Sequence, residues 1–304
     1  MERRSTRDLG PEVWKLFDQY VHGFVDRREF LERAAKLAVG GWTAAAILEA
    51  LSPRFAEAQV VAPNDTRLAA GYAEYESPLG YGRMRGYLAQ PVAARGGKLP
   101  VVLVVHENRG LNPHIEDITR RMALEGFLAF APDALTPLGG YPGDEDKARE
   151  LFAKLDQTKT SEDFIAALAF LKRQPGYAGK LGAVGFCFGG GVVNMLATRV
   201  PELQAAVPFY GTQPKAEDVG KIQAAMLIHY AETDDRINAG IPAFEAALKS
   251  AHVRYQLFVY PGTQHGFNND TTPRYDQAAA ALAWKRTIDF FKKQLAGRPH
   301  AFPR

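Results

Sequence analysis

From about residue 66 onward, the chain alternates between short apolar runs and longer segments with helical spacing of apolar positions. Residues 73–77 and 84–90 flank a turn rich in Gly and Pro and predict a polar hairpin. Continuous apolar runs, typical of strands buried on both faces, fall at 99–107, 127–133, 180–186, 204–210, 225–231 and 255–261. Helices are predicted at 114–126, 144–155, 161–174, 190–200, 242–251 and 276–295.

Buried strands that are separated by helices imply right-handed crossovers and hence a mostly parallel central sheet with helices on both faces. The pattern therefore predicts a single α/β domain over residues 59–304, doubly wound rather than a barrel because it begins with a polar hairpin. Within it, Ser161 is followed by the acidic Glu162 and Asp163, which predicts a capped helix start there and a helix over 161–174.

The first 58 residues follow a different pattern. Apolar residues recur at helical spacing over 11–25, and the adjacent Arg27 and Arg28 precede a weakly hydrophobic run over 37–48 and the small-residue site Ala56-Glu57-Ala58. A basic region, an apolar run and an A-x-A site in this order describe an export signal. The paired arginines resemble a twin-arginine signal, which predicts an encounter with the twin-arginine export machinery and delivery to the bacterial periplasm.

An alternative for the same segment is an amphipathic pair of helices that packs on the α/β domain. Lys36 and Glu49 bracket the apolar run and keep it shorter than a membrane span. The sequence alone leaves both interpretations open.

Composition removes several function classes. The chain has 304 residues with 37 basic and 34 acidic side chains, a balance too even to predict a nucleic-acid partner. It lacks a run of about 18 apolar residues, which excludes a multi-pass membrane protein. The single cysteine excludes an intramolecular disulfide and a cysteine-based zinc or iron–sulfur site, and it leaves a redox thiol without a resolving partner.

That cysteine lies in the segment GAVGFCFGGGVV, where a buried strand runs into a helix. The pattern is a nucleophile elbow of the G-x-nucleophile-x-G type, with Cys187 where serine is commoner and Gly185 and Gly189 on either side. The helix N-terminus would favour a thiolate and offer amides to an oxyanion. The alternative, a small buried hydrophobic residue, is the usual role of a free cysteine outside such a context.

A nucleophile at an elbow needs a histidine and an acid, in the chain order nucleophile, acid, histidine. The strand over 225–231 runs into Glu232, Asp234 and Asp235, and the strand over 255–261 runs into a Gly-rich loop with His265. Both loops follow the carboxyl ends of strands, where open α/β sheets place their sites. His229 falls inside a strand and is predicted to be a core histidine.

Four motifs in order, VVHENRGLN, GFCFGG, HYAETDDRIN and PGTQHGF, resemble the dienelactone hydrolase (carboxymethylenebutenolidase) family over about residues 70–295. The resemblance implies an α/β-hydrolase fold and a catalytic triad of Cys187, His265 and Asp234, with Asp235 as a solvated neighbour. It also implies that Glu107 contacts the thiol in the resting enzyme, where a solvated carboxylate is the alternative. The backbone amides of Phe188 and Asn108 would form the oxyanion hole.

The resemblance implies neither a cofactor nor a metal. His106, Glu107, His114 and Glu116 are close in sequence, but their spacing matches no H-E-x-x-H pattern.

The sequence departs from the family where a substrate carboxylate would be bound. Pro137 and Asn269 occupy the positions of two family arginines, and Arg109 is a new basic group near Glu107. We therefore expect Arg109 and Asn269 to contact a small-molecule substrate. The predicted function is hydrolysis of ester or lactone bonds through a thioester acyl-enzyme. The alternative is a catalytically idle scaffold that acts as a binding or envelope-associated protein.

Overall fold

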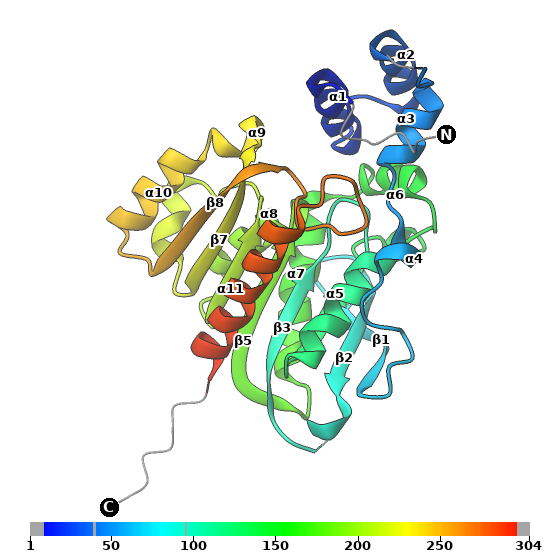
Figure 1. Ribbon diagram of the computed structural model, residues 1–304. Coiled ribbons are helices and arrows are strands. Elements are labelled where there is room, and N and C mark those ends of the chain that lie inside the picture. Colours follow the sequence, from blue (N-terminus) through cyan, green and yellow to red (C-terminus); the bar gives the residue numbers. More distant parts are fainter. Residues whose placement is uncertain (1–8, 39–40, 95, 297–304) are drawn as a thin grey trace, which may run out of the picture.

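The computed structural model describes residues 9–38, 41–94 and 96–296 (Figure 1). Its centre is an eight-stranded sheet with the strand order β1-β2-β4-β3-β5-β6-β7-β8. The strands are β1 (Leu68–Ser77), β2 (Gly82–Pro91), β3 (Leu99–Val105), β4 (Leu128–Pro132), β5 (Tyr177–Phe186), β6 (Ala205–Phe209), β7 (Ala225–Thr233) and β8 (Tyr255–Gln264).

The sheet confirms the predicted fold class. Strands β1 and β2 form the expected antiparallel hairpin, and β2 also runs antiparallel to β4. All the other neighbours pair in parallel, from β4 and β3 across to β7 and β8. Because parallel strands share one direction, their carboxyl ends meet at one edge of the sheet, and this is where the predicted site residues follow their strands.

Helices cover both faces of this sheet. The helices of the α/β body are α5 (Pro113–Leu124), α6 (Glu145–Phe152), α7 (Gln157–Lys172), α8 (Phe188–Arg199), α9 (Asp235–Asn238), α10 (Ile241–Ser250) and α11 (Gln277–Leu295). Helices α5 and α11 pack with one buried cluster, whereas α7, α8 and α10 pack with the other (Figure 1). Short 3₁₀ turns lie at Val92–Ala94, Thr136–Leu138 and Ala216–Lys221.

Several predicted boundaries are wrong: β1 begins at Leu68 rather than at residue 73, β5 begins at Tyr177 rather than at residue 180, and the start of one helix also differs. Helix α7 begins at Gln157 rather than at Ser161. The carboxylate of Asp156 accepts hydrogen bonds from the backbone N–H groups of Thr158 and Lys159 and caps the helix there. The Ser161 hydroxyl instead donates to the carbonyl of Gln157 inside the helix.

The N-terminal segment forms four helices: α1 (Pro11–Val21), α2 (Arg27–Leu37), α3 (Ala44–Leu51) and α4 (Phe55–Ala58). The first three bury a small apolar cluster of their own, in which Phe30 is fully enclosed. Within the described ranges no helix is both long enough and apolar enough to cross a membrane. The segment is thus helical, as the alternative predicts, but it has four helices rather than a pair, and the first three bury apolar faces against one another.

These helices lie over the carboxyl edge of the sheet and contact the body there (Figure 1). The Arg149 guanidinium lies 4.1 Å from the centre of the Tyr20 ring and donates to the Tyr20 carbonyl at 2.8 Å. Asp146 accepts hydrogen bonds from the Tyr20 hydroxyl and from Arg27, the latter at 2.5 Å. One arginine of the predicted export signal is therefore paired with the body.

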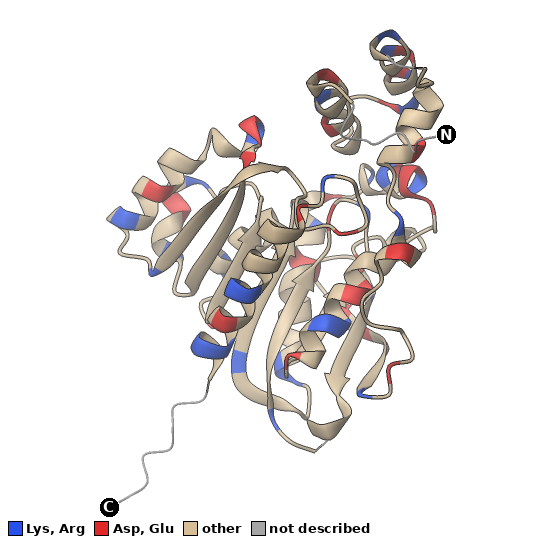
Figure 2. Ribbon diagram, viewed as in Figure 1, with Lys and Arg blue, Asp and Glu red and all other residues tan. Residues whose placement is uncertain are grey.

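Charged side chains lie mainly on the helices and loops, whereas the central strands are nearly free of them (Figure 2). Basic and acidic positions are mixed on the face shown, in keeping with the even charge balance.

Candidate active site

Cys187 lies at the turn between β5 and α8, where the sequence predicts a nucleophile elbow. Its backbone is strained, with φ at 55°, a value that residues with a side chain rarely adopt. A Cβ on Gly185 would lie 2.1 Å from the carbonyl oxygen of Gly189, and one on Gly189 would lie 2.3 Å from that of Val105. Only glycine therefore fits on either side of the elbow.

The structure brings His265 and Asp234 together beside this elbow. Asp234 follows β7 and His265 follows β8, and His265 Nδ1 lies 2.5 Å from Asp234 Oδ2. His265 is 4% exposed and Asp234 is 6% exposed, so the pair is shielded from water. Asp235 begins α9 and is exposed. Asp234, and not the adjacent Asp235, is therefore the carboxylate that contacts His265.

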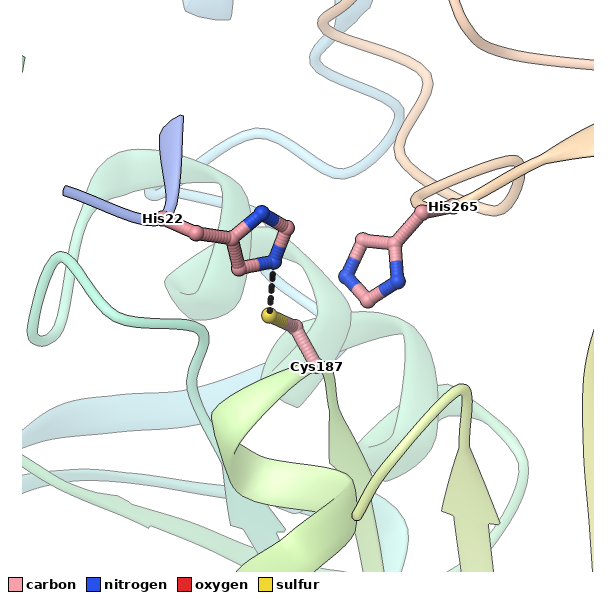
Figure 3. A group of neighbouring side chains, drawn as sticks. All are labelled: His22, Cys187 and His265. Atoms are coloured by element: carbon pink, nitrogen blue, oxygen red, sulfur yellow. Dashed lines mark hydrogen bonds between the residues drawn. The ribbon is translucent and has the colours of Figure 1, made fainter. Parts of the chain in front are cut away.

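The thiol lies between two imidazole rings (Figure 3). Cys187 Sγ is 3.6 Å from Nε2 of His22, and a ring nitrogen of His265 lies within 4.8 Å of both atoms. The two rings pack edge to face, with their centres 4.8 Å apart. His265 Nε2 is buried without a hydrogen-bond partner among the described residues, so it can accept a proton from the thiol or from water.

The electrostatics of this group favour a thiolate–imidazolium pair. Burial alone would raise the pKa of the Cys187 thiol, but the neighbouring His265 and His22 lower that pKa to about 5. Burial alone would lower the pKa of His265, but the charge of Cys187 and the hydrogen bond that His265 donates to Asp234 raise it to about 10. Between these values the sulfur is ionised and can act as a nucleophile.

The sequence did not point to His22. It is the C-cap residue of α1, and its Nδ1 lies 2.8 Å from the Asp18 carbonyl oxygen and 3.3 Å from Asp18 Oδ1. The Arg236 guanidinium lies 3.0 Å from its Nε2. A lone histidine at the end of an amphipathic helix carries no sequence signal for a site 165 residues away.

Glu107 lies in the cavity beside Cys187, but its hydrogen bond goes elsewhere. Its Oε2 accepts from Nδ2 of Asn269 at 2.8 Å. The Asn269 Oδ1 accepts from the backbone and hydroxyl of Thr271, which fixes the amide in place. Among the described contacts, Glu107 is the one acceptor for the two N–H groups of the Asn269 amide. In the described residues the contact that the resemblance assigns to Glu107, a hydrogen bond to the thiol, is made by His22.

Asn108 and Arg109 bind the end of α1. The Nδ2 of Asn108 and the Nη2 of Arg109 both donate to the carbonyl of Val21, at 2.9 and 3.1 Å. This satisfies a terminal carbonyl of the helix and places a cation at its negative end. Arg109 also faces Glu145 at 3.6 Å. Most of the donor groups of Arg109 are thus engaged by the protein rather than free for a substrate.

A cavity of about 350 Å³ opens onto Cys187 and His265. The body supplies Glu107, Asn108, Arg109 and Asn269, and the N-terminal helix supplies Phe17, Tyr20 and Val21. Phe188 is the first residue of α8, so its amide is one of the N–H groups that a helix start leaves without an intrahelical partner. Of the two predicted oxyanion-hole residues, Phe188 thus directly follows Cys187 at the start of α8, and Asn108 lines the cavity.

The donor atoms of His22, Cys187 and His265 are close enough to hold a metal ion such as zinc. The guanidinium of Arg236, 3.0 Å from His22 Nε2, opposes a cation there. Of the four residues near 106–116, His106 bonds the backbone at Glu107 and Ala134, and His114 faces Asp270. His229 is a satisfied core histidine as predicted, since it contacts Tyr260 and Thr287.

Two family models match the chain. The model described as dienelactone hydrolase family matches residues 84–295, and one described as YqhI-like matches residues 1–36. The first covers the sheet from β2 through β8, without β1, and every site residue of the body, and the second covers α1 and most of α2.

Individual relatives agree with the larger match. A hydrolase fragment of Escherichia coli, YghX, is 52% identical over 116 residues, which are 38% of this chain and 98% of the fragment. A Synechocystis protein with a provisional carboxymethylenebutenolidase name is 35% identical over 239 residues, with 70% of this chain and 93% of the relative covered. A crystal structure described as a dienelactone hydrolase homologue from Klebsiella pneumoniae is 31% identical with a TM-score of 0.66, covering 74% of this chain and 99% of that one. With its sheet, its elbow and these matches, the chain belongs to the dienelactone hydrolase family of the α/β-hydrolase superfamily.

Proposed function

We propose that this protein hydrolyses ester or lactone bonds through a covalent thioester on Cys187. The observation that carries the proposal is the buried Cys187 thiol at a strained elbow, next to a histidine that Asp234 orients at 2.5 Å. A scaffold that only binds a partner has no need of these three groups together. The idle-scaffold alternative therefore leaves the arrangement unexplained.

In the acylation step the Cys187 sulfur forms a bond to the carbonyl carbon, and the carbonyl π pair moves to the oxygen. The amides of Phe188 and Asn108 would stabilise that oxyanion. When the oxyanion collapses, the bond from carbon to the leaving oxygen breaks, and His265 Nε2 gives its proton to that oxygen. A lactone keeps the new hydroxyl on the acyl chain, whereas an ester releases an alcohol.

In the deacylation step His265 is neutral and accepts a proton from water as the water oxygen attacks the thioester carbon. Collapse of the second oxyanion breaks the C–S bond and restores the thiolate, and the acid leaves. Asp234 keeps the imidazole in the tautomer that presents Nε2 to both reactions. The cavity of about 350 Å³ fits a short acyl group or a small lactone.

The direct test is turnover of p-nitrophenyl acetate by Cys187→Ala. We expect no turnover above background with an unchanged circular dichroism spectrum, because the substitution removes one sulfur from a residue at the start of α8. Thr198→Ala, a similar truncation near the far end of the same helix, serves as a control and keeps wild-type turnover. Iodoacetamide should inactivate the wild type with one equivalent, on the only cysteine of the chain. Wild-type turnover by C187A would refute the nucleophile and favour the scaffold alternative.

A further inference from the structure

We infer that His22 is a further catalytic residue, a second proton acceptor for the Cys187 thiol, so that the N-terminal helix α1 completes the active site. The inference rests on the proposed function of Cys187 as the nucleophile. It adds a second imidazole–carboxylate pair, His22 with Asp18, to the pair of His265 with Asp234.

The position of His22 is fixed by contacts on both sides of the ring. On one side Nδ1 lies against the carbonyl and the carboxylate of Asp18, both of which are acceptors, so Nδ1 carries a hydrogen. On the other side Nε2 points to Cys187 Sγ at 3.6 Å. The end of α1 is held against the body because Asn108 and Arg109 both donate to the carbonyl of Val21. His22 is therefore presented by a docked helix end and not by a free tail.

An independent observation is the open position on His265. Its Nε2 is buried, and the described residues give it no hydrogen-bond partner, whereas the thiol lies on His22 (Figure 3). The sulfur thus has two imidazoles close by, since a ring nitrogen of each lies within 4.8 Å of it. While the thiol is hydrogen-bonded to His22, the Nε2 of His265 can form a hydrogen bond with a water molecule or with the leaving oxygen.

Several charged groups face His22 and decide how it titrates. The groups in contact with it come from α1, the elbow, α9 and the loop after β8: Asp18, Cys187, Arg236 and His265. Behind them, Arg274 pairs with Asp18 and Asp234 with His265. Burial lowers the pKa of His22, but the hydrogen bonds to Asp18 and Cys187 raise it above the ordinary value. Arg236 acts in the opposite direction, since a guanidinium donates only to a neutral Nε2. His22 can therefore accept the thiol proton and also exist in the neutral form.

The proton balance is simple. The thiol proton leaves Sγ and binds to Nε2 of either His22 or His265, which leaves the electron pair on sulfur. Two acceptors favour the thiolate more than one does, so the loss of His22 raises the pKa of the thiol. A charge-assisted hydrogen bond of this kind corresponds to a shift of about one to two pH units.

The test is the pH dependence of Cys187 alkylation by iodoacetamide in the full-length chain, followed by intact mass. We compare the wild type with H22Q, D18N and the control H252Q. His252 is an exposed histidine on the turn before β8, at the opposite end of that strand from His265. We expect the alkylation midpoint of H22Q to rise by about one to two pH units, D18N to rise in the same direction, and H252Q to match the wild type.

An H22Q midpoint equal to that of the wild type overturns the inference, and so does an equal rise in H252Q, which would reflect a general loosening of the fold. The thermal melting of each variant is measured as a check of folding. If H22Q does not unfold cooperatively, the alkylation midpoint of D18N is the measurement that tests the inference. Alkylation does not require turnover. If the wild type is inactive but the alkylation midpoint of H22Q is shifted, the proposed hydrolase function is refuted while His22 remains a second proton acceptor. If the wild type is active and the midpoint is unshifted, the hydrolase function stands and the role of His22 is refuted.

Discussion

Asp234→Asn tests whether the carboxylate acts on the chemistry through His265. In the structure Asp234 is 6% exposed and its Oδ2 lies 2.5 Å from His265 Nδ1. An asparagine of the same shape can donate to Nδ1, which would place the ring hydrogen on Nε2 and leave no lone pair for the thiol or water. The fold should be kept, because shape and volume change little.

The expected loss has two sources. A buried hydrogen bond to a charged partner contributes about 1.5–3 kcal/mol, which corresponds to a factor of about ten to a hundred in rate. The wrong tautomer adds to this, and in a serine triad the equivalent substitution costs about 10⁴ in kcat. We therefore expect kcat for p-nitrophenyl acetate to fall by about 10³–10⁴ in D234N.

The pH profile gives a second readout. The pKa of His265 is raised to about 10 by the charge of Cys187 and by the hydrogen bond that His265 donates to Asp234. Because the imidazolium is the acid in acylation, kcat/KM should fall as pH rises through that pKa. Removing the carboxylate lowers the pKa, so this alkaline limb moves to lower pH in D234N. Asp235→Asn is the matched control and should stay within about twofold of the wild type, since Asp235 is exposed. A D235N loss larger than that of D234N would refute the assignment.

Two further predictions concern the substrate and the destination of the protein. Because Asn269 stands where the family has an arginine, uncharged esters should be hydrolysed at least as well as the matching carboxylates. Asn269→Arg should raise kcat/KM for the carboxylate relative to the ester by about tenfold or less, because the new guanidinium would also pair with the nearby Glu107 carboxylate. A wild-type ratio that strongly favours the free acid would contradict this. We also propose export by the twin-arginine route: residues 1–60 fused to a folded reporter should reach the periplasm, and replacement of both Arg27 and Arg28 by Lys should stop it. Unchanged export of the Lys pair would remove that proposal.

The sheet and the body part of the site could be predicted because their signals are local. Continuous apolar runs mark strands buried on both faces, and the elbow requires small residues at Gly185 and Gly189 within a five-residue segment. Asp234 and His265 follow their strands directly, so the strand order alone brings them to one edge. The start of α7 was missed because the cap is Asp156, whose carboxylate accepts two backbone N–H groups, whereas the prediction placed the start at Ser161.

His22 could not be predicted for a different reason. Its contact with Cys187 depends on the docking of α1, which is fixed by the Val21 carbonyl and by Tyr20 against the body. Arg109 illustrates the same limit, since its sequence position predicts a substrate contact while its guanidinium largely binds the helix end. The sequence describes each partner, but it contains no local pattern that pairs residues 22 and 187.

The role of the N-terminal segment therefore depends on whether it stays attached. Cleavage after Ala58 would remove His22, the partner of the thiol, together with Phe17 and Tyr20 from the cavity wall. The cavity would then be open on that side, and the pKa of Cys187 would be lowered by His265 alone. Because His22 belongs to the segment, export is compatible with the completed site only if the segment is not cleaved. The twin-arginine route carries folded proteins across the membrane, so the segment could cross with the body. Phe30 is fully enclosed within the segment and Arg27 pairs with Asp146 of the body, and on this basis we propose that the segment stays attached and completes the proposed active site.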